Sequence, residues 1–177
     1  MSITKPFCYN KSNIRAIVLG ADPTNFSDHG KPVQIETVFG IGSGDQRYFN
    51  GILKNLEVID LGLKDIYVQN LVQEPLESET AKNNNWEIHA EHWLPKTKNE
   101  FDKIDKSRKI PVLVTAERIM KFLYPGVPDA KEIYKGDAFI PFQNNLLDRP
   151  LYAFYRHYKY KLSVHSNYVQ RLKSTLM

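Results

Sequence analysis

Short apolar segments alternate with amphipathic segments along this chain, and this alternation restricts its fold more than any other feature. Three runs rich in Ile, Val and Leu have the length and composition of strands buried on both faces: residues 14–19, 65–72 and 110–115. Three segments have the apolar spacing of helices: residues 48–61, 86–104 and 116–123. The alternation predicts an α/β fold of three layers, a three-layer sandwich in which helices flank a central, mostly parallel sheet of about four strands.

Three other segments complete this prediction. Residues 37–41 (TVFGI) are expected to form a second short strand or an extended segment. Pro95 interrupts the helical pattern of residues 86–104, so the sequence predicts either two pieces or one kinked helix there. Residues 73–85 are polar and acidic, cannot build a core, and are expected to be a loop.

Length and composition limit how the chain is organised. With 177 residues, of which 42% are hydrophobic, we expect one domain spanning residues 1–177, and a monomer. Residues 1–13 lack an apolar signal core, and no apolar run approaches the roughly 18 residues of a membrane span. These features predict a soluble, cytoplasmic protein with no membrane partner. The single cysteine, Cys8, cannot form a disulfide within the chain.

Positive charge is concentrated near the C-terminus. Six of the 24 Lys and Arg residues lie in residues 149–177, together with none of the 20 Asp and Glu residues. Clustered cations gain free energy by displacing counterions from phosphates, so this asymmetry favours a polyanionic partner, and a solvated basic surface is the alternative. Tyr and Phe side chains interleave with Arg156, Lys159 and Lys161. That mixture suits contact with phosphates and bases, or an aromatic face packed on the core with its cations in water.

The sequence Gly20-Ala21-Asp22-Pro23 follows the first apolar run directly. Ligands of parallel α/β sheets bind beyond the carboxyl ends of the strands. A carboxylate on this rigid turn can orient or deprotonate a water, or stabilise a developing cation. The alternative for Asp22 is an Asx turn or a helix cap.

Two more predicted strand ends carry side chains suited to a base. Phe39 offers a π-face on which a base can stack, although an aromatic residue in an apolar strand is also a normal core residue. Asn70 ends the run of residues 65–72 with an amide that can read the edge of a pyrimidine, or can tie down the following loop.

These three motifs, in this order, resemble those of the uracil-DNA glycosylase superfamily over approximately residues 14–165. The family has Gly-x-Asp-Pro after a core strand, then a strand that contains Phe, then a strand that ends in Asn. The resemblance implies a fold of that type, and it implies that Asp22 positions a water without a metal or organic cofactor. It further implies that an extruded base is bound by Gly20, Ala21, Pro23, Phe39 and Asn70.

The second catalytic motif of that family differs in this chain. Family members place a His after the last core strand, where it donates to the departing base. We assign residues 139–147 (FIPFQNNLL) to this place, and they contain no His. Phe142 then falls at the His position and is expected to contact the base. Gln143 and Asn144 are the candidate donors, and His157 or His165 are the alternatives.

The expected function is a DNA glycosylase that extrudes a modified base from single- or double-stranded DNA and hydrolyses its N-glycosidic bond. The DNA backbone is expected to contact Arg156, Lys159 and Lys161. Two alternatives remain open: an inactive base-binding module of the same fold, and an enzyme of small nucleotides on a similar scaffold. His89 and His92 have no third ligand at a recognisable spacing, so no metal site is expected.

Overall fold

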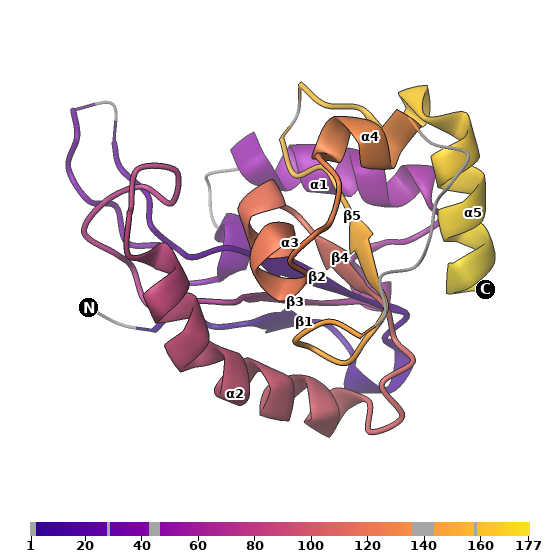
Figure 1. Ribbon diagram of the computed structural model, residues 1–177, viewed down its shortest axis with the longest axis horizontal. Helices are drawn as coiled ribbons and strands as arrows, with labels where there is room; N and C mark the ends of the chain where they lie inside the picture. Colours follow the sequence, from indigo (N-terminus) through magenta and orange to yellow (C-terminus); the bar gives the residue numbers. More distant parts are fainter. Residues whose placement is uncertain (1–2, 28, 43–46, 136–143, 158) are drawn as a thin grey trace.

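The computed structural model describes residues 3–27, 29–42, 47–135, 144–157 and 159–177. Within these residues a five-stranded sheet has the order β1-β3-β2-β4-β5 (Figure 1). The strands are β1 (Phe7–Cys8), β2 (Ala16–Gly20), β3 (Ile66–Asn70), β4 (Val112–Val114) and β5 (Leu151–Ala153). Strands β2 to β5 run parallel, and β1 pairs antiparallel with β3. The four parallel strands match the expected number, and the two-residue strand β1 is an addition to it.

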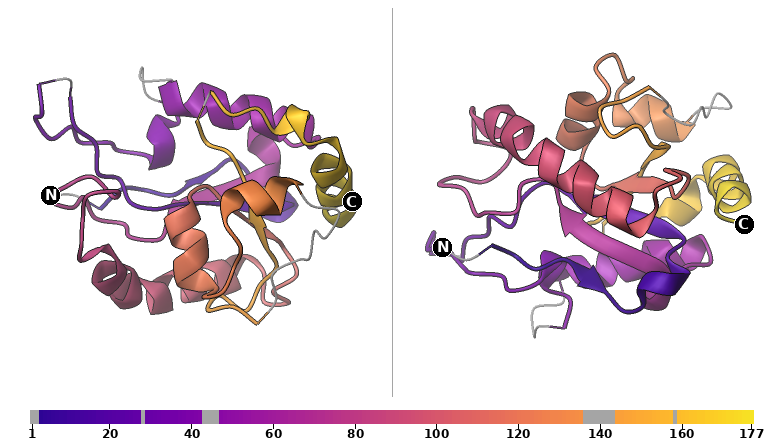
Figure 2. Two further views of the ribbon diagram at one scale, coloured as in Figure 1. Left: turned by 45° about the horizontal axis from the view of Figure 1, so that its top comes forward. Right: turned by 90° about the horizontal axis from the view of Figure 1, so that it is seen from below.

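Helices surround this sheet. The α-helices are α1 (Arg47–Val58), α2 (Trp86–Ile104), α3 (Glu117–Leu123), α4 (Ala130–Lys135) and α5 (Ser166–Leu176). The short 3₁₀ helices are η1 (Lys11–Asn13), η2 (Val38–Gly40), η3 (Leu63–Asp65) and η4 (Leu162–Val164). Figure 2 shows α1 on one face of the sheet, and α2 with α3 on the other. The fold is therefore α/β with a mostly parallel sheet between helices.

The chain reverses its direction across the sheet at β2. From β2 it passes through α1 to β3, and then returns through α2, past β2, to β4 on the other side. Right-handed crossovers in opposite directions place their helices on opposite faces, as α1 and α2 lie in Figure 2. The carboxyl ends of β2 and β4 therefore flank the point where the connecting loops diverge. This is the usual ligand position in an open parallel sheet.

The central strands and the facing helices form one buried apolar cluster. All residues of β2 and β3 are buried, as their apolar runs predict. From the helices, α1 contributes Ile52 and Leu56, and α2 contributes Trp86 and Phe101, all at most 1% exposed. Each such side chain contributes roughly 1.5–3 kcal/mol by burial, so both helices are held firmly against the strands that they cover.

One expectation about secondary structure is wrong, and one pair of alternatives is narrowed to a single helix. Residues 37–41 form no strand, because Phe39 and Gly40 have φ angles of 57° and 67°, which turn the chain through η2. Of the two alternatives for residues 86–104, two pieces is excluded, because helix α2 continues through Pro95 as one helix. A proline inside a helix removes one hydrogen bond. Trp93 and Thr97 on either side of it are buried, and their packing outweighs that loss.

A buried ion pair closes the amino-terminal edge of the sheet. Arg149, which is 2% exposed and precedes β5, donates to Asp102 at 2.9 Å and to Asp105 at 3.0 Å. Burial acts to raise the pKa of Asp105, but hydrogen bonds from Ser107, from the Ile110 N–H and from Arg149 outweigh it and lower that pKa to about 2. One cation of the basic C-terminal region is therefore committed to the fold.

Candidate functional site

A cavity of about 420 Å³ opens beyond the carboxyl ends of β2 and β3. We call it the Asp22 cavity. The predicted site residues that line it are Ala21, Asp22, Pro23, Phe39 and Asn70. Arg156, from the segment after β5, also lines it. The cavity has the volume of a small-molecule site. The structure thus brings together residues from four separate parts of the chain.

Three donors hold the carboxylate of Asp22, which is 8% exposed. The Thr24 N–H donates to Oδ1 at 3.0 Å. The Thr80 hydroxyl and the Trp86 Nε1–H donate to Oδ2 at 2.6 and 3.0 Å. The contact from Thr24 is an Asx turn. Asp22 therefore both stabilises a turn, as one reading of the sequence expected, and lines the cavity. A carboxylate has about four acceptor positions, and the three described donors leave about one for a water or a ligand.

Arg118, at the start of α3, contacts the loop and the helix that supply the donors to Asp22. Its guanidinium donates to both carboxylate oxygens of Glu87, at 2.6 and 2.5 Å, and to the carbonyl oxygen of Thr80. The same guanidinium lies over the Trp86 ring, 5.3 Å from its centroid. The hydrogen bond from Arg118 lowers the pKa of Glu87. The loop that supplies Thr80 and the helix that supplies Trp86 are therefore joined beside the cavity.

The ring of Phe39 and the amide of Asn70 both lie against Gly20. A Cβ atom at Gly20 would lie 2.2 Å from Oδ1 of Asn70 and 2.8 Å from Cζ of Phe39. Both side chains therefore pack directly on the glycine backbone. Asn70 is 3% exposed, so its amide is fixed in the cavity wall. Any larger residue at position 20 would displace the two groups that are suited to a base.

Phe39 has a strained backbone at the mouth of this site. Its φ of 57° is in the left-handed region, which a bulky side chain rarely adopts. The cost is of order 1–3 kcal/mol, and such residues cluster at active and ligand-binding sites. The half-buried ring of Phe39 lines the Asp22 cavity.

The segment assigned to the second catalytic motif has a different position relative to the sheet than expected. The last core strand is β5, so residues 139–147 precede that strand and do not follow it. The assignment failed because the apolar run at the start of residues 139–147 resembles a strand as closely as β5 does. The residues that follow β5 include Arg156 and His157.

The three residues assigned to this motif therefore have different outcomes. Phe142 and Gln143 lie outside the described residues. Asn144 is exposed, and its neighbour Leu146 donates its N–H to the carbonyl oxygen of Leu123, at the end of α3 and the amino-terminal edge of the sheet. The described lining of the Asp22 cavity does not include Asn144. Asn144 therefore precedes the last strand of the described sheet, and its expected contact with a base stays a prediction.

His157 follows β5 by a few residues, next to Arg156. Its Nδ1 accepts a hydrogen bond from the Lys159 N–H at 3.2 Å. With Nδ1 as the acceptor of this contact, Nε2 is the ring nitrogen that can donate. Arg156 lines the Asp22 cavity, and His157 lines the cavity next to it.

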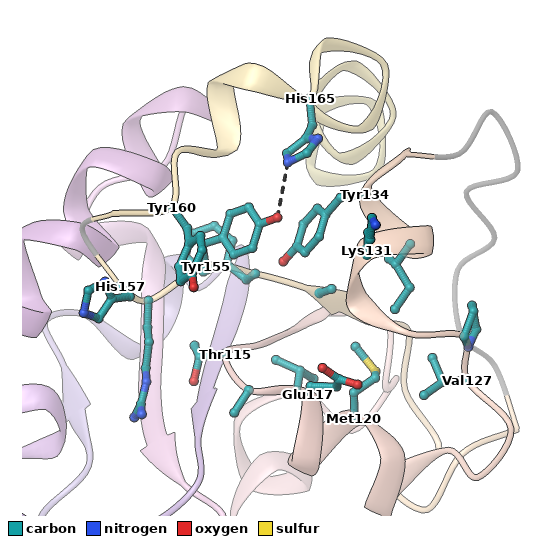
Figure 3. Close-up of a pocket in the computed structure, with 17 residues that line it drawn as sticks. Thr115, Glu117, Met120, Val127, Lys131, Tyr134, Tyr155, His157, Tyr160 and His165 are labelled. Atoms are coloured by element: carbon teal, nitrogen blue, oxygen red, sulfur yellow. Dashed lines mark hydrogen bonds between the residues drawn. The ribbon is translucent and has the colours of Figure 1, made fainter. Parts of the chain in front are cut away.

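This neighbouring cavity, which we call the aromatic cavity, has a volume of about 620 Å³. It shares Ala116 and Arg156 with the lining of the Asp22 cavity. In Figure 3 its labelled aromatic side chains lie on one side, and Met120 and Val127 lie on the other. The labelled aromatic residues are Tyr134, Tyr155, His157, Tyr160 and His165, and Phe154 also lines the cavity.

The basic C-terminal region is divided between folding and the cavities. Arg149 belongs to the buried ion pair described above, and Lys173 pairs with Asp60 at 2.8 Å. Lys159 and Lys161 are exposed and line a shallow groove together with Tyr155 and Tyr160. The three cations predicted to contact DNA therefore lie beside the two cavities. Other aromatic residues of this region, Tyr152, Phe154 and Tyr168, belong to the core.

Sequence reasoning missed Thr80, Trp86 and Arg118. Thr80 is part of the acidic loop, and Trp86 reads as an apolar helix residue, so neither carries a motif. Arg118 and Glu87 are 31 residues apart, and only the packing of α3 beside α2 makes them partners. The one available signal was the position of Trp86 at the first turn of α2, directly after the loop that contacts Asp22.

A comparison with protein-family models and a comparison with curated proteins both find no match to this chain. Of the helices in the described ranges, none combines the length and the apolar character that crossing a bilayer requires.

Proposed function

We propose that this protein is a DNA glycosylase of the uracil-DNA glycosylase type, with the fold that this implies. It extrudes a modified base and hydrolyses its N-glycosidic bond. The lining of the Asp22 cavity carries the proposal, because a carboxylate, an aromatic ring and an amide from separate loops meet in about 420 Å³. A ring for stacking, an amide for the base edge and a carboxylate for the sugar are the groups that this chemistry needs.

Hydrolysis breaks the bond between the base and the anomeric carbon of the sugar, and a water oxygen takes the place of the base on that carbon. Asp22 orients this water, accepts its proton and offsets the positive charge that develops on the sugar. Phe39 stacks on the base and Asn70 bonds to its edge. The base leaves with the electron pair of the broken bond, so negative charge develops on its ring and oxygens.

Arg156 and His157 stabilise that negative charge in this proposal, in the place first given to Gln143 and Asn144. The resemblance requires a His after the last core strand, and His157 is such a residue once β5 is the last strand. The guanidinium of Arg156 donates charge-assisted hydrogen bonds from the lining of the Asp22 cavity. In this proposal Nε2 of His157, in the lining of the adjoining cavity, donates a further hydrogen bond to the base.

Oligonucleotides that carry uracil, hypoxanthine, xanthine or an oxidised pyrimidine test this proposal. After incubation, alkaline treatment cleaves each strand in which a base has been removed. His157→Ala is expected to lower the cleavage rate constant about 10²-fold, the usual loss for one donor to a developing anion. His92→Ala is the matched control, because His92 is exposed on α2 and outside both cavities. Absence of cleavage on all of these bases, in single and double strands, refutes the proposal.

A base-binding module without catalysis is the second candidate. The three donors to Asp22 favour it, since a carboxylate with several fixed partners often has a structural role. This candidate predicts salt-dependent binding of DNA and no product from the parent protein. The enzyme predicts product from the parent, and none from Asp22→Asn at nearly unchanged affinity for DNA.

A further inference from the structure

In the hydrolysis proposed above, the aromatic cavity contributes only Arg156 and His157, and most of its volume has no role there. Its volume of about 620 Å³ is larger than the 420 Å³ of the Asp22 cavity. Ala116 and Arg156 line both, so one guanidinium stands at the boundary between two spaces. A ligand that fills both cavities must pass this charge.

The rings of the aromatic cavity form a stack. Tyr155 stacks on Tyr134 with 4.1 Å between centroids, and on Tyr160 with 5.4 Å between centroids. The Tyr155 hydroxyl lies 3.2 Å from Nε2 of His165, the contact drawn as a dashed line in Figure 3. The faces of Tyr155 are occupied by these neighbours, so a bound ligand meets ring edges there. Aromatic edges carry partial positive charge and favour the π-face of another ring.

The opposite wall suits a flat ring as well. Met120 and Val127 lie across the cavity from Tyr134 and Tyr155 in Figure 3. A thioether and a branched aliphatic group pack on the faces of aromatic rings without demanding hydrogen bonds. Lys131 adds a cation to the lining. The chemistry of the whole region therefore fits two planar rings joined by an anionic link at Arg156.

We propose that the two cavities together bind two consecutive nucleotides of single-stranded DNA. The base to be removed enters the Asp22 cavity, its neighbour enters the aromatic cavity, and the phosphate between them contacts Arg156. This inference rests on the proposed function for the identity of the first base. The phosphates beyond this pair continue along the groove lined by Lys159 and Lys161.

Duplex DNA fits this arrangement less well. A second extruded base must also be unpaired and unstacked, which costs additional free energy in a duplex and little in a flexible single strand. The protein is therefore expected to bind a single strand at least about tenfold more tightly than the same sequence in a duplex. This ratio assumes that the duplex loses the free energy of about one base–aromatic contact.

The test uses the whole chain and a short oligonucleotide that contains one 2′-fluoro-deoxyuridine, whose glycosidic bond resists hydrolysis. Fluorescent 2-aminopurine stands either on its 5′ side or on its 3′ side. Anisotropy reports binding, and 2-aminopurine intensity reports the surroundings of the neighbouring base. The expected result is a change of intensity on one side only, together with tighter binding of the single strand. Saturated binding with unchanged intensity on both sides, or tighter binding of the duplex, overturns the inference.

Val127→Phe fills the aromatic cavity from its aliphatic wall and supplies the decisive variant. It is expected to abolish the intensity change and to weaken binding about tenfold. If Val127→Phe does not fold, Tyr160→Ala is the second variant. Tyr160 is 59% exposed at the end of the stack, and its removal is expected to weaken both binding and the intensity change. The controls are Ile88→Phe and Tyr9→Ala, which alter exposed residues outside both cavities.

The two proposals fail in different ways. If the protein removes a base and both cavity variants behave like their controls, the two-nucleotide inference is wrong and the glycosylase stands. If no base is removed but the intensity change occurs and Val127→Phe abolishes it, the inference on binding stands and the glycosylase is refuted.

Discussion

The indole Nε1 of Trp86 lies 3.0 Å from Oδ2 of Asp22, so the first residue of α2 holds the carboxylate that follows β2. An indole N–H can only donate, and this bond therefore requires an acceptor at Oδ2. The Thr80 hydroxyl donates to the same oxygen at 2.6 Å. The carboxylate in the Asp22 cavity is thus part of the packing between the first strand and the second helix, and the same atoms serve both the fold and the proposed chemistry.

Asp22→Asn is expected to abolish base removal and to destabilise the protein by about 1–3 kcal/mol, the usual cost of an unmatched buried polar group. Whichever way the amide turns, its NH₂ faces a donor, either the Trp86 indole or the Thr24 N–H. Urea unfolding measures the free energy. Asp60→Asn is the control, because Asp60 is an exposed partner of Lys173, and it should change stability by less than about 0.5 kcal/mol. Equal stability of the two variants would show that the hydrogen bond between Trp86 and the Asp22 carboxylate does not stabilise the fold.

Gly20→Ala is expected to abolish specific binding of the base. The added Cβ meets Oδ1 of Asn70 at 2.2 Å and the Phe39 ring at 2.8 Å, so both groups must move. Gly62→Ala is a matched control, since a Cβ there has its nearest contact at 3.7 Å, with Oδ2 of Asp65. Fluorescence anisotropy with uracil-containing and uracil-free oligonucleotides measures the effect. Preserved discrimination in Gly20→Ala would contradict the assignment of Asn70 and Phe39.

Replacing Lys159 and Lys161 together by Ala is expected to weaken DNA binding similarly for all sequences. Each phosphate contact adds about 0.7 to the slope of log affinity against log salt for single strands, so the slope should fall by about 1.4. Both side chains are exposed, and the fold should therefore stay intact. Lys173→Ala, which removes a cation paired with Asp60, should leave the slope unchanged. An unaltered slope in the double variant would mean that these lysines contact no phosphate.

Arg149→Met is expected to destabilise the protein by about 1–3 kcal/mol, because it removes the charge-assisted hydrogen bonds to Asp102 and Asp105. The pKa of Asp105 is about 2 in the folded protein, below its ordinary value of 3.8. Its contribution to stability is therefore complete above pH 3.8 and is lost as the pH falls through 2. Unfolding free energies measured between pH 2 and pH 6 should show a shallower acid dependence in Arg149→Met.

Arg108→Met is the control for that measurement. Arg108 also pairs with Asp102, at 2.7 Å, but its side chain is 42% exposed. Exposed pairs contribute roughly 0–1 kcal/mol, so this variant should retain most of the parent stability. If Arg108→Met loses as much unfolding free energy as Arg149→Met, the exposed pair between Arg108 and Asp102 contributes the stability assigned to Arg149.

The sequence was sufficient to predict the layers and most elements of the fold. Buried parallel strands and amphipathic helices leave direct periodic signals, so β2, β3, β4, α1, α2 and α3 were predicted near their observed bounds. Residues 37–41 were misread because their apolar residues suit a short strand, and nothing in the sequence indicates that Phe39 has a left-handed backbone conformation. The apolar run that begins residues 139–147 competed with β5 in the same way, and local periodicity cannot decide which of two runs joins a sheet.

The candidate site was predictable where residues lie at the carboxyl ends of strands. Asn70 ends β3 and Asp22 comes shortly after β2, and the parallel sheet necessarily brings these strand ends to one edge. Thr80, Trp86 and Arg118 reach the same edge through the path of a loop and the angle of two helices, which leave no periodic signal. His157 was visible in the sequence, but the role now proposed for it depends on β5 being the last strand of the described sheet.

Three hydrogen bonds connect the turn after β2 with the loop between β3 and α2 and with the first residue of α2. The Leu76 N–H donates to the Thr24 hydroxyl at 2.8 Å, and Thr80 and Trp86 both bond to Asp22. An amide held by a hydroxyl exchanges its hydrogen with solvent only when that contact opens. The deuterium exchange rate of the Leu76 amide therefore reports the opening of the Asp22 cavity, and a ligand that closes the cavity will slow that single amide before it slows the sheet.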